Sequence, residues 1–240
     1  WIKGEGGTTV DIRVYRESED KYYDFTVERR KIEVPTVAYE MLEDNIGYVQ
    51  VTEFDEVTSD QYIAAVDDLK AQGMEGLIVD IRDNPGGLLS CVVDMLDYML
   101  PEGTIVYTED KNGEGDTYTS DAEHYFDLPL AVLVNGNSAS ASEIFSGAIQ
   151  DYETGTIIGT QTFGKGIVQS ILPFNDGSAI KSTVSRYFTP RGTCIHGEGI
   201  TPDVEVDLNE ELKTKLTIEK SEDNQLQKAI ENVKEQIAAE

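Results

Sequence analysis

Three short apolar runs, separated by segments with helical periodicity, constrain the fold of this chain most strongly. The runs are residues 46–51, 77–81 and 130–134. Runs of this length with almost no polar residue are typical of strands buried on both faces, as in a parallel sheet. Between them, residues 58–72 and 88–100 repeat apolar side chains at helical spacing. This order predicts an α/β fold in which crossover helices connect the strands of a mostly parallel sheet.

The same alternation continues toward the C-terminus. Residues 142–152 are predicted to form a helix and residues 156–159 a short strand. Residues 167–174 and 179–188 are predicted to pair as a hairpin across a turn with Asp and Gly. Residues 110–127 are acidic, contain glycine and lack a clear period. We therefore expect an exposed excursion there.

The two ends of the chain differ from this pattern. Residues 8–15 and 22–28 alternate β-favouring and polar residues, which predicts a second hairpin. Residues 32–37 then read as a strand that links this hairpin to the rest. Residues 209–240 are charged and favour a helix, without caps strong enough to fix its ends. The opening residues read like the interior of a longer chain.

Charge and cysteine content exclude several classes of function. The net charge is −27, and such a field repels phosphate backbones and anionic lipids, so we expect no nucleic-acid partner. Two cysteines make neither a disulfide framework nor a zinc site. No stretch approaches the ~18 apolar residues of a membrane span.

A run of serines follows the apolar segment 130–134 and precedes a predicted helix. Ser138, Ser140 and Ser142 alternate there with alanine. Such a turn brings a hydroxyl to the carboxyl end of the sheet, where open α/β folds place their sites. The helix N-terminus supplies free amides for a developing oxyanion. The spacing does not choose among the three serines, since any of them can also be a helix N-cap.

Lys165 offers a base that needs no histidine. It has a glycine on each side, and Gln169 falls on the same face if the segment is extended. A lysine titrates near 10.4, so acting as a base at neutral pH needs a pKa lowered by about three units, roughly 4 kcal/mol. Burial in an apolar pocket can supply that shift. The alternative reading is an exposed loop lysine and an ordinary polar strand residue.

A Pro-Gly-Gly turn is the third piece of the candidate site. Gly86 and Gly87 place bare backbone N–H groups ahead of the predicted helix 88–100, where one can serve as a second oxyanion donor. Arg82, just before this turn, is expected to pair with a neighbouring aspartate. A Ser-His-Asp enzyme would have to use His124 or His196, the two histidines of the chain. We expect His196 to make a structural hydrogen bond and His124 to be solvated.

With these residues assembled, the chain resembles the C-terminal processing peptidases, also called tail-specific proteases. The resemblance covers roughly residues 45–206. Five elements carry it in order: Ile46-Gly47-Tyr48-Val49, Asp80-Ile81-Arg82-Asp83-Asn84-Pro85-Gly86-Gly87, Asn137-Ser138-Ala139-Ser140-Ala141-Ser142-Glu143, Thr162-Phe163-Gly164-Lys165-Gly166 with Gln169, and Gly199-Ile200-Thr201-Pro202-Asp203. Each motif is weak alone, but the ordered set is specific.

The resemblance assigns roles that the residues alone left open. It implies that Ser140 is the nucleophile, Lys165 the general base and Gln169 the residue that orients the lysine. The oxyanion hole would combine the Ala141 amide with that of Gly86 or Gly87. The implied fold is a crotonase-like or Clp-protease-like core. No metal or organic cofactor is implied.

The family carries a PDZ domain before its catalytic core, and only its final strands are matched here. The resemblance thus divides the chain into C-terminal strands of a truncated PDZ domain, a peptidase core and a C-terminal helical segment, at residues 1–31, 32–207 and 208–240. It implies an extracytoplasmic enzyme of the bacterial cell envelope, periplasmic or on the outer face of the membrane and anchored in full-length form. The implied substrates are proteins or peptides with unfolded, apolar C-termini, and the assembly to test is a homodimer.

The sequence therefore predicts a serine endopeptidase of the Ser-Lys type. Three alternatives remain open. The first is a non-catalytic peptide-binding scaffold on the same fold. The second is a latent protease that needs its full PDZ domain. The third is an acyl-CoA enzyme of the crotonase type, which would need an acid-base carboxylate where this chain has its serine run.

Overall fold

The computed structural model of the protein describes residues 1–30, 34–121, 123–215 and 217–239. The chain divides into two compact units, Trp1–Val34 and Pro35–Glu240. The first unit is the predicted hairpin, in which β1 (Thr9–Arg16) and β2 (Lys21–Glu28) pair antiparallel. The strand predicted at 32–37 falls partly outside the described residues, and the next described strand begins at Val37.

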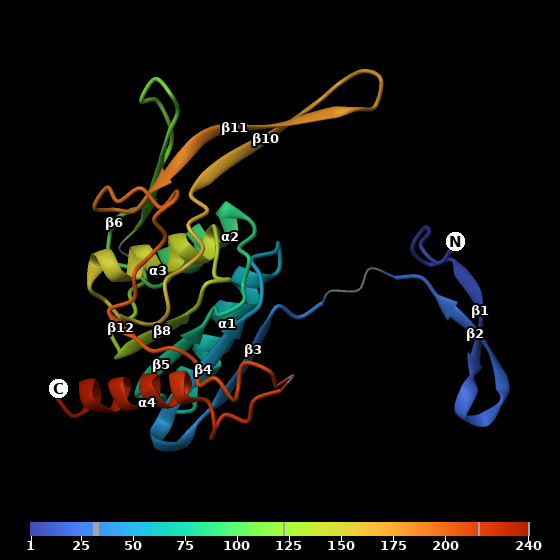
Figure 1. The fold of residues 1–240 in the computed structure, drawn as a ribbon, viewed down its shortest axis with the longest axis horizontal. Helices are drawn as coiled ribbons and strands as arrows, with labels where there is room; N and C mark the ends of the chain where they lie inside the picture. The colour runs from blue at the N-terminus through green and yellow to red at the C-terminus, as the bar shows by residue number, and fades with distance from the viewer. Residues whose placement is uncertain (31–33, 122, 216, 240) are drawn as a thin grey trace. The chain divides into compact units, whose positions relative to one another are not determined.

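A six-stranded sheet forms the centre of the second unit (Figure 1). In the order in which they lie side by side, its strands are β12 (Val204–Glu205), β9 (Thr156–Gly159), β8 (Leu130–Val134), β5 (Gly76–Asp80), β4 (Ile46–Val51) and β3 (Val37–Met41). All neighbours run parallel except β3 and β4. Every residue of β5 and β8 is buried, as their apolar runs predicted. The mostly parallel α/β sheet is thereby confirmed.

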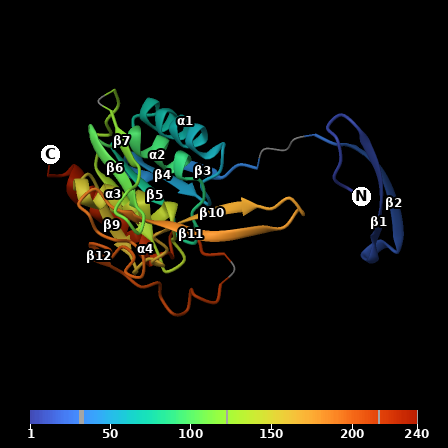
Figure 2. The same ribbon diagram turned by 90° about the horizontal axis from the view of Figure 1, so that it is seen from above.

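A second, antiparallel sheet carries the predicted C-terminal hairpin. Its order is β10 (Ile167–Pro173), β11 (Ala179–Phe188), β6 (Gly103–Glu109) and β7 (Thr117–Ser120). The outer part of the β10–β11 hairpin protrudes from the body of this unit in both ribbon views (Figure 1 and Figure 2). The expectation for residues 110–127 was wrong in part. Four of those residues form β7, because their short alternating pattern pairs with β6.

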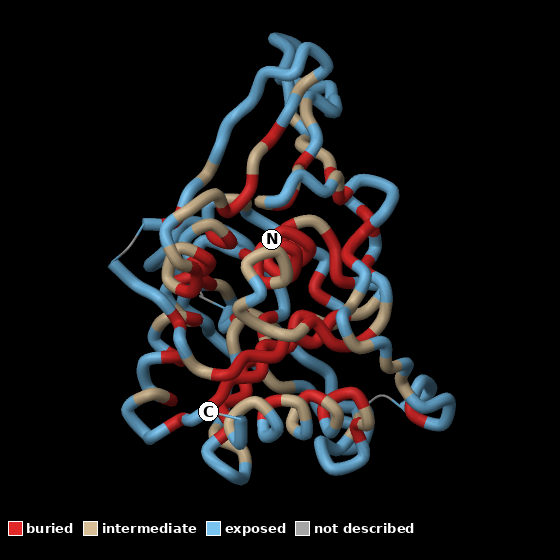
Figure 3. The backbone as a smooth tube through the Cα atoms, turned by 90° about the vertical axis from the view of Figure 1, so that its left-hand side faces the viewer, coloured by how far each residue is buried: buried red, intermediate tan, exposed pale blue. Residues whose placement is uncertain are grey.

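Helices cover both faces of the six-stranded sheet. One face packs against α1 (Thr58–Ala71), α2 (Leu89–Asp97) and α3 (Ala141–Tyr152), and the other against α4 (Asn224–Ile237). Successive residues of β5 face opposite sides of the sheet. Val79 packs on the side of α1, α2 and α3, and Ile78 packs on the side of α4. In Figure 3 the buried residues gather in the centre of the view, above the helix that ends at the C-terminus.

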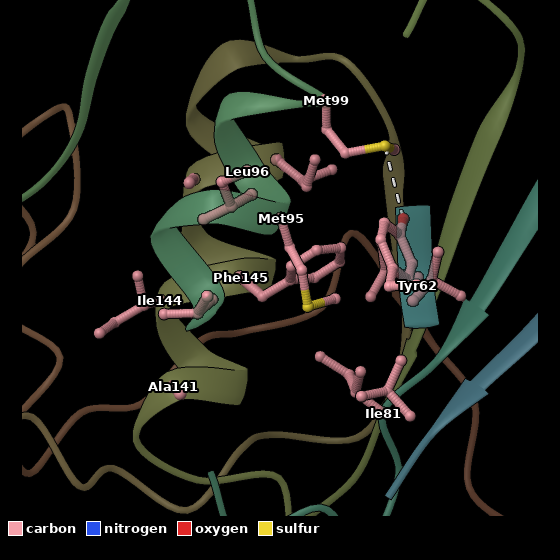
Figure 4. Close-up of a cluster of buried hydrophobic side chains, with 14 of the residues drawn as sticks. Tyr62, Ile81, Met95, Leu96, Met99, Ala141, Ile144 and Phe145 are labelled. Carbon is pink, nitrogen blue, oxygen red and sulfur yellow. Dashed lines mark hydrogen bonds between the residues drawn. The ribbon is translucent and has the colours of Figure 1, made fainter. Parts of the chain in front are cut away.

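The core fixes the position of α3, the helix that follows the serine run. Phe145 is fully buried, and its ring lies 6.2 Å from that of Tyr62 in an edge-on arrangement (Figure 4). The Tyr62 hydroxyl donates a hydrogen bond of 3.4 Å to the sulfur of Met99. Ala141, at the first turn of the helix, is buried as well. The N-terminus of α3 is therefore held by packing on several elements.

The C-terminal segment is helical over a shorter range than predicted. The helix α4 begins at Asn224, where an apolar stripe of Leu226, Ala229 and Val233 starts to face the sheet. The expectation of weak caps was wrong, because the Asp223 side chain accepts hydrogen bonds from two amides of the first turn. Within the described part of the chain, no helix is long and apolar enough to span a membrane.

Candidate active site

The serine run forms a strained turn between β8 and α3. Ser140 immediately precedes the helix, with φ 58° and ψ −112°. A non-glycine residue with positive φ costs about 1–3 kcal/mol and persists only where its surroundings hold it. The turn projects Ser140 at the carboxyl end of the parallel sheet, where the sequence predicted a nucleophile.

The structure distinguishes the three serines by their hydrogen bonds. Ser138 is buried, and its hydroxyl donates to the Ile81 carbonyl at 2.8 Å. Ser142 is also buried, and its hydroxyl donates to the Asn84 carbonyl at 2.9 Å. Ser140 is half-buried; its side-chain oxygen faces the backbone of Glu143 in a capping box, and its hydroxyl donates no hydrogen bond to any described residue. Two of the serines thus hold the turn together by donating across it, whereas the hydroxyl proton of Ser140 has no acceptor among the described residues.

The carboxylate of Glu143 ties this turn to the segment that carries Lys165. Glu143 is fully buried in the first turn of α3. Its Oε2 accepts hydrogen bonds from the amides of Ser140 and Lys165, each at 2.8 Å. Its Oε1 accepts from the Thr162 hydroxyl and the Gly164 amide, each at 2.6 Å. Four donors therefore compensate the burial of this charge, and no cation pairs with it within the described residues.

The shared carboxylate brings Ser140 and Lys165 together. Because both amides donate to one oxygen atom, the two nitrogens lie no farther apart than twice 2.8 Å. The Phe163 amide adds a direct bond of 3.0 Å to the Ser138 carbonyl. Residues twenty-five positions apart in the sequence are thus neighbours in the site. Glu143 was not singled out by the sequence analysis, although its place three residues after Ser140 is that of a capping residue.

The side chains of Lys165 and Gln169 are less enclosed than the sequence analysis expected. Both are exposed, and no hydrogen bond joins the Lys165 amine to Ser140 or Gln169 among the described residues. The expected burial of Lys165 is therefore absent from this structure. The reason is the place of Lys165 in the fold. It lies just before β10, and this strand leads out into the protruding hairpin (Figure 1). Catalytic hydrogen bonds commonly tighten only when substrate is bound.

The Pro-Gly-Gly turn lies directly against the serine turn. A Cβ atom added at Gly86 would be 2.8 Å from the Ser140 Cβ and 2.9 Å from the Ala141 nitrogen, so only glycine fits. The Gly86 amide donates to the Asn84 side chain at 2.9 Å. The amides of Gly87 and Ala141 have no hydrogen-bond partner among the described residues. Of the two glycines, Gly87 is therefore the one whose N–H remains available.

Two residues of the preceding loop hold the glycine turn against the serine turn. Asn84 is fully buried, and its backbone carbonyl accepts from the Ala139 amide at 3.0 Å. Asp83 accepts from the side-chain amides of Asn135 and Asn137, at 3.0 and 2.7 Å. No role was predicted for these two residues from the sequence. They lie in the segment 80–87 that carries the family resemblance, but only the fold shows their partners.

Arg82 makes the structural pairing that the sequence predicted. Its guanidinium contacts Asp80 at 2.6 Å and Asp223, the N-cap of α4, at 2.8 Å. Burial acts to raise the pKa of Asp223, but hydrogen bonds from Arg82 and from the first turn of α4 outweigh it and lower the pKa. Hydrogen bonds and charge from Asp80 and Asp223 also raise the pKa of Arg82 against the opposing effect of burial. The arginine thus joins α4 to the loop that carries the glycine turn.

Neither histidine side chain makes a hydrogen bond to a candidate site residue among the described residues. His196 is exposed, and its side chain makes no hydrogen bond to the described residues, so the expected structural bond was wrong. The segment 195–199 is held by its backbone instead, for example through the Gly197 amide and the Gly164 carbonyl at 3.0 Å. His124 is exposed and lies beside the Tyr98 ring. No cluster of possible metal ligands occurs in the described part of the chain.

Known proteins resemble this chain over most of its length. The model of Peptidase family S41 matches residues 45–206. The carboxyl-terminal-processing protease of Synechocystis sp. is 38% identical over 206 residues, which cover 84% of this chain and 48% of that protein. Carboxy-terminal processing protease CtpA of Bacillus subtilis is also 38% identical, over 86% of this chain and 44% of its own length. The chain spans about half the length of the curated relatives it matches.

Solved structures share the fold. A photosystem II D1 C-terminal processing protease superposes with a TM-score of 0.68 at 32% identity, over 85% of this chain and 57% of that chain. A putative S41 protease from Bacteroides fragilis gives a TM-score of 0.69 at 18% identity, over 97% and 67% of the two chains. At that lower identity the similarity speaks for the fold alone.

Proposed function

Since this chain belongs to Peptidase family S41, we propose that it is a serine endopeptidase that cuts proteins near their C-terminal tails. Ser140 is the nucleophile in this proposal, Lys165 the general base and Gln169 the residue that orients the lysine. The relatives named as carboxyl-terminal-processing proteases support the reaction class. The roles of the individual residues rest on the arguments below.

One observation carries the proposal most directly. The Glu143 carboxylate binds the amides of Ser140 and Lys165 through one oxygen atom. A nucleophile and a base must be neighbours, and this contact brings their backbones together while the Ser140 hydroxyl donates to no described residue. The same carboxylate argues against an acyl-CoA enzyme. Glu143 lies where an acid-base residue would be needed, but it is fully buried and already accepts four hydrogen bonds.

The mechanism follows from these positions. A neutral Lys165 takes the proton of the Ser140 hydroxyl as its oxygen attacks the peptide carbonyl. The negative oxygen of the tetrahedral intermediate accepts hydrogen bonds from the free amides of Ala141 and Gly87, assisted by the positive end of α3. The protonated lysine then gives its proton to the leaving amine. Water, activated by the same lysine, releases the acyl group from Ser140.

The exposure of Lys165 favours a second candidate, a latent form of the same protease. The mechanism needs the amine of this lysine enclosed beside the serine, whereas the side chain of Lys165 is exposed here. A bound substrate or a further part of the full-length protein would exclude water from this position. In this candidate the site becomes competent only when its surroundings close over Lys165.

The wider setting is proposed from the same relationship. The substrates are proteins or peptides with unfolded, apolar C-termini, and the enzyme acts outside the cytoplasm in the cell envelope. No cofactor enters the mechanism, since the proton transfers use side chains of this chain alone. The hairpin of residues 1–31 is proposed to be the end of a PDZ domain, and a homodimer is the assembly to test.

Digestion of casein, a loosely folded protein, tests the proposal. Wild type, Ser140→Ala and Ser138→Ala are compared, with the products identified by mass spectrometry. We expect cleavage by wild type and by Ser138→Ala, and none by Ser140→Ala. Cleavage by Ser140→Ala would contradict the assignment of the nucleophile. If wild type is inactive, a longer chain with the complete N-terminal domain separates the latent enzyme, which gains activity, from a binding scaffold, which does not.

A further inference from the structure

We propose that the free edge of β10 binds the substrate, which adds to the sheet as an extended, uncharged and apolar strand. The proposal builds on the proposed protease function, because it says how a polypeptide is presented to Ser140. Its starting point is the protruding hairpin of β10 and β11 (Figure 1).

The edge of β10 lacks the protection that edge strands usually carry. β10 is the outermost strand of its sheet, and no described strand pairs with its other side. Its residues Ile-Val-Gln-Ser-Ile-Leu-Pro include no charge, in a chain whose net charge is −27. Charged side chains normally keep such an edge from pairing with other chains, and so does proline. Here the only such residue is Pro173 at the far end, so residues 167–172 are open to pairing.

The opposite edge of the same hairpin provides a contrast. β11 pairs with β6 only through residues 186–188, which leaves its outer part unpaired among the described strands. That part carries Lys181, directly across the hairpin from Ile171. One edge is thus guarded by a charge while the other is not. This asymmetry points to the β10 edge as the one used for binding.

The open edge begins at the catalytic residues. The Gly166 carbonyl accepts from the Tyr187 amide at 2.9 Å, so the backbone of Gly166 faces β11. Successive residues of a strand face opposite edges, and the polar groups of Ile167 therefore point the other way. On that side the Lys165 amide donates a hydrogen bond to the Glu143 carboxylate, which also accepts from the Ser140 amide. A polypeptide lying along this edge would pass the serine turn, which is where a scissile carbonyl must be.

The side chains around the edge indicate the chemistry of the bound strand. Ile171 and Leu172 on β10, Phe174 in the turn and Phe163 beside the site are all exposed. Apolar exposed side chains favour apolar partners, whereas the main-chain hydrogen bonds of an added strand do not depend on sequence. The ligand expected here is therefore an unfolded segment that is apolar and free of charge, without a strict consensus.

A matched pair of proline variants tests strand addition. Ile171→Pro and Lys181→Pro lie on the same rung of the hairpin. The alternation places the Ile171 N–H on the open β10 edge and that of Lys181 on the β11 edge. Binding of a fluorescein-labelled, uncharged, Ala- and Val-rich peptide is measured by anisotropy in the Ser140→Ala background, so the result does not depend on catalysis. We expect Ile171→Pro to raise the Kd about tenfold and Lys181→Pro to leave it unchanged.

A second measurement uses the backbone of the peptide. N-methylation of one amide at a time removes single main-chain donors, and strand addition predicts that losses of affinity recur at every second residue. Equal effects of the two proline variants, or losses without this period, would overturn the proposal. A concentration-dependent dimer seen by light scattering and abolished by Ile171→Pro, with peptide binding unchanged, would assign the edge to a second copy of the chain. Failure of the protease function itself would show separately, as casein left intact while peptide binding still follows the predicted pattern.

Discussion

The buried carboxylate of Glu143 offers the sharpest test of how this site is built. Glu143→Gln keeps the size of the side chain but replaces one carboxylate oxygen by an NH2 group. The remaining oxygen can accept from only two of the four donors that Glu143 now satisfies. The NH2 group would face the other two donors without a bond to either.

The size of the effect follows from the number of lost partners. A buried donor left without a partner costs about 1–3 kcal/mol, so two of them cost about 2–6 kcal/mol. This is a large share of the ~5–15 kcal/mol that stabilises a typical domain. In the orientation that turns the NH2 group toward Ser140 and Lys165, the same change also releases the contact between their backbones. Misplacement of a catalytic group by an ångström can reduce the rate about a hundredfold.

Urea unfolding and fluorophosphonate labelling measure the two effects. Labelling is compared without urea, at a temperature at which the variant is still folded. A loss of reactivity then does not reflect a loss of structure. Glu235→Gln, the same substitution at an exposed position of α4, is the control and should behave as wild type. Wild-type stability together with wild-type labelling in Glu143→Gln would refute the reasoning.

Four further variants test other contacts of this structure. Ser138→Ala removes the buried hydroxyl that holds the turn, so it should lower the free energy of unfolding by ~1–2 kcal/mol and leave fluorophosphonate labelling intact. Gly86→Ala places a Cβ 2.6 Å from the Ala139 carbonyl oxygen, at a φ of +99°. Labelling should therefore be lost, and the free energy of unfolding measured in urea should fall by at least about 1 kcal/mol. Asp223 has a lowered pKa in the folded state, so its stabilising effect is complete above its ordinary value near 3.8 and disappears as pH falls through the folded pKa. The stability difference between wild type and Asp223→Asn, measured by urea unfolding, should therefore shrink toward zero in acid. Arg82→Ala should lower the free energy of unfolding by about 3–5 kcal/mol at neutral pH, because it leaves the buried carboxylates of Asp80 and Asp223 without their cation.

The central sheet was predictable because its signal is local. The apolar run 77–81 is typical of a strand that a parallel sheet buries on both faces, and the structure places every residue of β5 in the interior. The start of α4 was less predictable. Its N-cap, Asp223, is one acidic residue among many in that segment, and only the fold shows that it also pairs with Arg82.

The candidate site was predictable in its residue types but not in its connections. The three serines were equivalent in the sequence, and it is the partners of Ser138 and Ser142, both distant in the chain, that distinguish them from Ser140. The contact through Glu143 joins Ser140 and Lys165, which are more than twenty positions apart, so no periodicity could indicate it. The exposure of Lys165 depends on where the hairpin that follows it projects, which a local pattern does not encode.

Fluorophosphonate labelling of the wild type and of Lys165→Met, with the labelled residue mapped by mass spectrometry, tests the central claim most directly. The substitution keeps an unbranched apolar side chain and removes its amine. The account predicts a single adduct on Ser140 that forms about a hundredfold more slowly in Lys165→Met. An adduct on Ser138 or Ser142, or a rate that does not depend on Lys165, would contradict it.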